Sequence, residues 1–79
     1  MSIITIYPRE IHEQKYDFKV QIDMLEGELY LLVDGKDVLL SGDQAVIVQS
    51  GISFILANKS EMEASIKCVN AEAREENKY

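Results

Sequence analysis

The sequence has little of what builds disulfides, zinc sites and phosphate-binding surfaces. Its one cysteine, Cys68, excludes an internal disulfide and leads us to expect a reducing, cytoplasmic compartment. One histidine and one cysteine cannot supply the usual ligands of a zinc site. Eight Lys and Arg against fourteen Asp and Glu give a net charge of −6. This balance argues against direct nucleic-acid binding, because such a protein needs cations opposite the phosphates.

Long apolar runs are also missing. No run approaches the ~20 residues that a transmembrane helix needs, and the N-terminus lacks the basic and apolar regions of a signal peptide, so we expect no membrane partner. The 79 residues, of which 47% are hydrophobic and 28% charged, are typical of one small globular domain.

Two segments alternate between apolar and polar residues. From Tyr16 to Met24 the even positions are aromatic or aliphatic and the odd positions are polar, and the pattern returns from Met62 to Cys68. This period of two predicts strands with one buried and one solvated face. We therefore expect Met62 and Cys68 to face the interior, with Cys68 buried and inert.

Turn residues separate a series of short apolar runs. Asp34-Gly35 predicts a tight hairpin, because both central residues of such a turn need positive φ. Similar breaks recur about every 8–10 residues, which is typical of an all-β sandwich or barrel. We expect about seven to eight short antiparallel strands in one domain over residues 1–70. A polar tail, 71–79, would follow as a frayed helix or disordered segment.

Three central runs are apolar at both odd and even positions: Leu29–Val33, Ala45–Val48 and Phe54–Leu56. A strand that is apolar on both faces needs cover on both, and one small barrel covers only the inner face. We favour a homodimer, with these candidate contacts: Tyr30, Leu32, Ile47 and Ile55. Alternatively, the short N-terminal strand and the tail supply the cover.

The order of the turn motifs carries a family resemblance. The motifs are, in chain order, Leu25-Glu26-Gly27-Glu28-Leu29, Val33-Asp34-Gly35, Gly42-Asp43, Ser50-Gly51 and Asn58. Over residues 14–69 this order resembles the small barrel of the cupin superfamily. The resemblance implies a cupin-like jelly-roll barrel that is often dimeric, and it does not define one function, because the fold hosts many.

The chain departs from the cupin pattern at the metal ligands. The family places two His and a Glu before the glycine matched by Gly27, and a third His before the asparagine matched by Asn58. Those positions here are Gln14 and Tyr16 (or Glu13 and Lys15, with one more residue of spacing), Val20 and Phe54, and the family's proline position is Gln49. The inward positions of the long strands also carry no carboxylate or imidazole. We therefore expect a closed apolar interior that holds no metal or other cofactor.

A small ligand is expected to contact four residues near the mouth of the barrel: Gln14, Tyr16, Gln49 and Phe54. The hydroxyl and amide groups among them supply hydrogen bonds, although Tyr16 is also a candidate core residue. The only imidazole, His12, has no assignable catalytic partner, and we expect it to be a solvated surface residue.

Acidic residues concentrate in one stretch of the chain. Between positions 23 and 43 there are six carboxylates, Asp23, Glu26, Glu28, Asp34, Asp37 and Asp43, and a single cation, Lys36. They either solvate strand edges and turns or form a docking face for a basic protein.

Three functional hypotheses follow from these patterns. We favour a metal-free cupin-like module that acts by binding, as a homodimer or with a protein or small-molecule partner. The first alternative is a metal-independent enzyme resembling the nucleoside phosphorylases among short cupin-like proteins, with an anion site drawn from Arg9, His12, Lys15 and Lys19. The second is a small acidic inhibitor or adaptor of a basic protein that handles nucleic acids.

Overall fold

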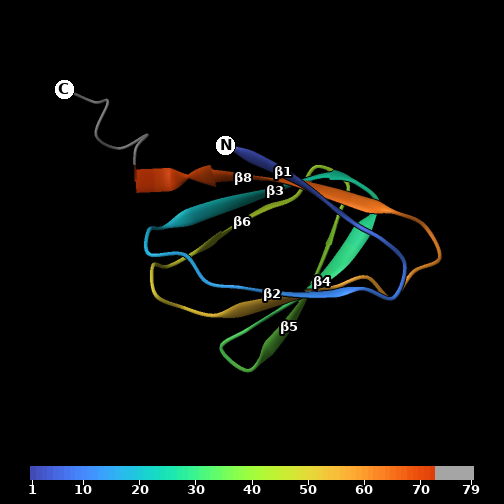
Figure 1. Ribbon diagram of the computed structural model, residues 1–79, viewed down its shortest axis with the longest axis horizontal. Helices are drawn as coiled ribbons and strands as arrows, with labels where there is room; N and C mark the ends of the chain where they lie inside the picture. The colour runs from blue at the N-terminus through green and yellow to red at the C-terminus, as the bar shows by residue number, and fades with distance from the viewer. Residues whose placement is uncertain (73–79) are drawn as a thin grey trace.

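Eight antiparallel strands form two four-stranded sheets in the computed structural model, which describes residues 1–72 (Figure 1). The strands are β1 (Ser2–Ile6), β2 (Ile11–Gln14), β3 (Val20–Glu26), β4 (Glu28–Val33), β5 (Lys36–Ser41), β6 (Ala45–Val48), β7 (Phe54–Ala57) and β8 (Ala64–Asn70). Sheet A has the order β1-β8-β3-β6, and sheet B has the order β2-β7-β4-β5. The expected all-β architecture is confirmed. No helix within residues 1–72 is long and apolar enough to cross a membrane.

Consecutive strands pass from one sheet to the other at every step except one. Among strands that follow one another in sequence, only β4 and β5 are hydrogen-bonded neighbours in one sheet. The turn between them is Asp34-Gly35, whose φ angles are 55° and 74°. These two positive values are those of a type I′ turn, so the predicted hairpin is confirmed. All other neighbours in sequence lie in opposite sheets, which is the winding of a jelly roll.

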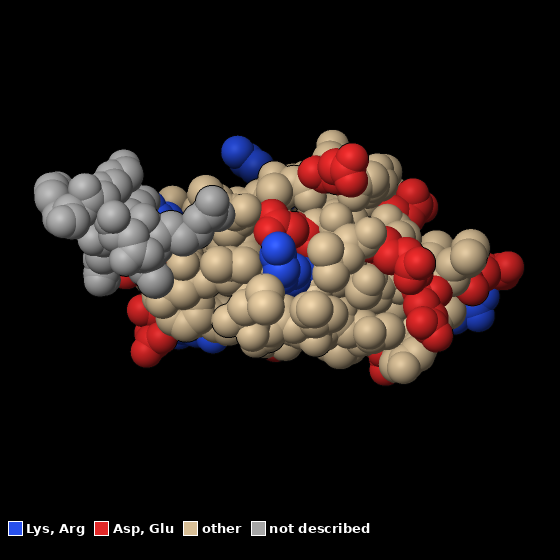
Figure 2. Space-filling model, turned by 90° about the horizontal axis from the view of Figure 1, so that it is seen from above, with Lys and Arg blue, Asp and Glu red and all other residues tan. Residues whose placement is uncertain are grey.

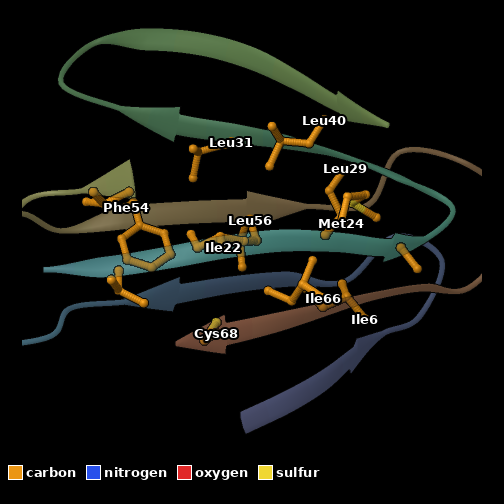
Figure 3. Packing of buried hydrophobic residues seen from close by; sticks show 13 residues of the cluster. Ile6, Ile22, Met24, Leu29, Leu31, Leu40, Phe54, Leu56, Ile66 and Cys68 are labelled. Atoms are coloured by element: carbon orange, nitrogen blue, oxygen red, sulfur yellow. The ribbon is translucent and has the colours of Figure 1, made fainter. Parts of the chain in front are cut away.

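The core lies between the two sheets and is built from the alternating side of each strand (Figure 3). In β3, Val20, Ile22 and Met24 are buried, as the alternation predicts. In β8, Ala64, Ile66 and Cys68 are buried in the same way. Cross-strand partners are Ile22 with Cys68 and Met24 with Ile66, so the inner rows of the two strands meet side by side.

One expectation about this core is wrong. Met62 is 73% exposed, because β8 begins only at Ala64 and the preceding loop turns the Met62 side chain outwards. At the start of the expected tail, residues 71–72 are helical, and Ala71 is buried with its N–H donating to the Lys19 carbonyl at 2.8 Å. Glu72 also accepts from the Lys19 N–H at 2.8 Å, so these two residues are anchored to the barrel. The rest of the predicted tail, 73–79, lies outside the described residues.

Candidate functional site

Three aromatic side chains pack together at one end of the interior. The Tyr16 ring lies 5.0 Å from the Phe18 ring and 6.1 Å from the Phe54 ring, measured between centroids. Tyr16 and Phe18 precede β3 and still pack against the core cluster, while Phe54 opens β7 and is 1% exposed. This end of the interior is therefore closed by aromatic contacts rather than hollow.

Tyr16 also contacts Cys68 across the interior. The Tyr16 hydroxyl and the Cys68 thiol lie close enough for each to affect the pKa of the other. Burial raises the pKa of the Cys68 thiol above its usual 9.0, and the Tyr16 contact offsets part of this rise. Burial also raises the pKa of Tyr16 above 10.0. Near neutral pH both groups therefore keep their protons, and the thiol is a poor nucleophile.

These two pKa values predict how stability changes in alkali. The unfolded chain loses both protons first, so the free energy of unfolding should fall as the pH rises above about 9. We expect denaturant unfolding between about pH 8 and about pH 10.5 to show this loss. A double variant, Tyr16→Phe with Cys68→Ala, should show a shallower decline. If the free energy of unfolding fell equally with pH in the wild type and the double variant, Tyr16 and Cys68 would not be the groups responsible for the loss.

The four residues expected to contact a ligand are only partly brought together. Gln14 pairs with Phe54 across β2 and β7 and shares its inner face, beside Tyr16. Gln49 lies apart from them, exposed beyond the end of β6, where it lines a surface hollow. Because Phe54 is fully buried, a ligand could touch it only if the aromatic contacts opened. Ligand contact at these residues stays a prediction.

The candidate dimer contacts divide between the two sheets. Leu32 pairs with Ile55, and Tyr30 lies two positions along the same strand, so these three share the outer face of sheet B. Ile47 belongs to β6 in sheet A, where it pairs with Gln21 on the outer face and is 50% exposed. Of the alternative cover, β1 lies at the edge of sheet A beside β8, and most of the tail, 73–79, lies outside the described residues.

The acidic stretch does not form one patch. Asp23 lies on the outer face of sheet A, where its carboxylate is 3.9 Å from the Lys67 ammonium. Others lie at the two ends of β4: Glu26, Glu28 and Asp43 near its start, Asp34 and Asp37 near its end. Figure 2 shows the face of sheet A with acidic side chains gathered mostly toward one end of the molecule. Docking of a basic protein by all six residues stays a prediction.

The four cations of the anion-site hypothesis are separated as well. His12 is not a solvated surface residue as expected: it pairs with buried Leu56 on the inner face and is half-buried, with Nε2 3.5 Å from Glu10 Oε1. Arg9 lies near Glu61, 3.8 Å away, at the start of β2. Lys15 and Lys19 follow the other end of that strand. No cluster of all four forms an anion site.

Glu10 is itself held in place by the turn that joins β1 to β2. Its carboxylate accepts the Tyr7 N–H at 2.8 Å, and this bond lowers the pKa of Glu10, with a smaller contribution from His12. Arg9, with φ of 70°, takes the left-handed position of the turn after Pro8. The Glu10–His12 pair therefore supports a turn and needs no catalytic role.

Asn58 is the one buried polar residue of the described chain, and it organises the loop from β7 to β8. Its Nδ2 donates to the Ile6 carbonyl at 2.9 Å and to the Met62 carbonyl at 2.8 Å. Its Oδ1 accepts from the N–H and hydroxyl of Ser60, at 2.9 and 2.8 Å. The resemblance drew attention to Asn58, but its bond to Ile6, 52 residues away in sequence, depends on the tertiary structure.

Solved structures share this arrangement of strands. The Cupin_2 domain of an XRE-family transcriptional regulator from Enterobacter cloacae matches with a TM-score of 0.75 at 21% identity, over 81% of this chain and 70% of that one. A predicted oxalate decarboxylase from Thermotoga maritima matches with a TM-score of 0.72 at 20% identity, over 84% and 59%. The chain has the cupin fold.

A designed protein shares the fold over nearly its whole length. A de novo designed double-stranded β-helix matches with a TM-score of 0.68 at 20% identity, over 86% of this chain and 96% of the design. By contrast, this chain spans only 59% of the length of the Thermotoga protein. No protein-family model and no curated protein matches the sequence. The shared cupin fold therefore carries no activity to this chain.

The residues at the metal-ligand positions of the cupin fold do not fit a metal. Tyr16, Val20 and Phe54 lie in or against the apolar core, and none of them offers a carboxylate or imidazole. Gln14 beside them provides one amide. Within residues 1–72, no three His, Cys, Asp or Glu side chains gather as a metal site requires.

Proposed function

We propose that this protein is a metal-free binding module with the cupin fold, and that it works as a homodimer joined through the outer face of sheet B. The observation that carries the proposal is the apolar character of that face. Side chains there belong to strands whose other side already fills the core, and two of them, Ile11 and Leu39, are 69% and 44% exposed.

Cross-strand registers place the apolar residues of this face in two adjacent rows. One row crosses the sheet as Ile11, Ala57, Tyr30 and Leu39. The next row crosses it as Glu13, Ile55, Leu32 and Asp37. The apolar residues are contiguous, and acidic residues stand only at the two ends of the second row. An apolar centre with a charged rim is the usual anatomy of a protein–protein interface.

A second copy fits this face better than a strongly acidic partner. Lys59 lies with its ammonium 4.7 Å from the centre of the Tyr30 ring, so the face carries a cation beside its aromatic centre. Glu13 and Asp37 provide opposite charges at its margins. A two-fold axis through the apolar centre would let the acids of one copy approach Lys59 of the other.

The proposal predicts different results for two matched substitutions. Ile55→Lys puts a cation in the apolar centre of the sheet B face and should weaken the dimer at least tenfold, because the charge would have to leave water when the two copies associate. Ile47→Lys makes the same change on sheet A and should leave the dimer intact. Analytical ultracentrifugation of the wild type and both variants measures the effect.

Circular dichroism and unfolding curves would show that both variants keep the fold. A monomeric wild-type protein at about 100 μM would overturn the proposal, because a useful interface buries enough area for tighter association than this. Equal dissociation of both variants would instead show that the contact does not lie on sheet B.

A further inference from the structure

A surface hollow of about 250 Å³ lies on the open side of the sandwich, between the β4–β5 hairpin and the end of β6. It is lined by Val33, Asp34, Lys36, Ile47, Val48, Gln49 and Ile52. Segments from both sheets therefore form its walls. This volume is below the about 300–1,000 Å³ of drug-sized ligand sites, so the hollow suits a molecule of only a few carbons.

The apolar lining of the hollow is continuous with the core. Val48 is buried in the core cluster, and Val33 and Ile52 pack against it. These residues give the hollow a firm base, because their side chains are held from behind by the interior. An aliphatic group of a ligand would bury apolar surface against them.

The rim of the hollow has one negative, one positive and one neutral polar group. Asp34 and Lys36 flank Gly35 in the type I′ turn, so the hairpin holds their backbones in place. Gln49 contributes an amide from the segment after β6. Within the described residues, none of these three side chains forms a hydrogen bond or ion pair. Three polar groups thus border a hollow with an apolar base without using their bonding capacity inside the protein.

We propose that this hollow binds a free aliphatic α-amino acid such as leucine or valine. Asp34 would accept hydrogen bonds from the ligand ammonium, and Lys36 would donate to the ligand carboxylate. Gln49 can donate or accept, and the aliphatic side chain would lie on Val33 and Ile52. A simple carboxylic acid would meet the Asp34 charge, and a simple amine would meet Lys36, so the rim selects the zwitterion.

The inference depends on the proposed role as a binding module and is independent of the dimer. NMR titration of the ¹⁵N-labelled protein with L-leucine tests it, alongside 4-methylpentanoate and 3-methylbutylamine, which each lack one of the two charges. Leucine should shift the amides of residues 33–36 and 46–52 in a saturable manner. Each analogue should bind about three- to fivefold more weakly, as expected when one exposed charge pair is lost.

Two variants test the charged rim directly. Asp34→Asn keeps a residue that tolerates the left-handed turn and removes its charge, and Lys36→Met keeps most of the side-chain length. Each should weaken leucine binding about three- to fivefold. Asp43→Asn, in the separate β5–β6 turn, is the matched control and should leave binding unchanged.

Three outcomes would overturn the ligand assignment. They are no saturable shifts with leucine, shifts that spread over the whole barrel, and equal binding of leucine and both analogues. None of them changes the expected dissociation of the dimer by Ile55→Lys, so failure of this inference is distinguishable from failure of the proposed dimer.

Discussion

Replacing Gly27 with alanine is expected to destabilise the protein by about 3–5 kcal/mol. Gly27 joins β3 to β4 where the chain passes between sheets, and its φ is 79°. A Cβ there would lie 2.6 Å from the Glu63 carbonyl oxygen and 3.0 Å from the Ala64 Cα. Both neighbours are backbone atoms at the start of β8, so they cannot rotate away. The loss is a large part of the about 4–12 kcal/mol that a domain of this size has.

Gly51→Ala is the matched control for this prediction. Gly51 has nearly the same φ, 78°, but a Cβ there would meet no atom within 4 Å. It should cost only about 1–2 kcal/mol, the conformational penalty of a left-handed residue. The difference between the two variants in the free energy of unfolding, measured with denaturant, gives the cost of the steric clash apart from the cost of the left-handed backbone conformation. Equal losses would show that the contact with β8 does not matter.

Asn58→Ala is expected to cost about 2–4 kcal/mol. The substitution removes four hydrogen bonds and leaves the Ile6 and Met62 carbonyls without the amide that they contact. Because Asn58 is 1% exposed, water cannot replace that amide without a rearrangement of the loop. The free energy of unfolding by urea measures the effect, and amide exchange should show the loop from β7 to β8 opening first.

Ser60→Ala provides the comparison. It removes only the hydroxyl that bonds Asn58 Oδ1 and the Met62 backbone, in a part of the loop that is near solvent. We expect a loss of about 0.5–1 kcal/mol. If the two variants were equally unstable, the hydroxyl rather than the buried amide would be the anchor of the loop.

Gly27 and Asn58 act at the same place in the fold. Gly27 packs against the end of the β7–β8 loop, and Asn58 ties that loop to the end of β1. Both residues match the cupin pattern, whereas the positions matched to metal ligands are filled by apolar side chains such as Val20 and Phe54.

Local patterns predicted some of this fold and part of the candidate sites. Alternation identified the buried rows of β3 and β8, and Asp34-Gly35 identified the hairpin. The same rule failed for Met62, because alternation cannot show where a loop ends and a strand begins. Alternation also could not show that Ile47 and Ile55 lie in different sheets. A run that is apolar at both odd and even positions does not indicate which sheet its strand joins.

The sequence alone determined which faces of the long strands are apolar, where the tight hairpin turns, and that only one histidine and one cysteine are present. These properties depend on residue type and on spacing over two to four positions. Tertiary structure decided which strands pair, that neighbours in sequence alternate between sheets, and which side chains meet at the hollow. Those features arise from contacts between segments far apart in the chain, whose registers depend on how all eight strands pack together.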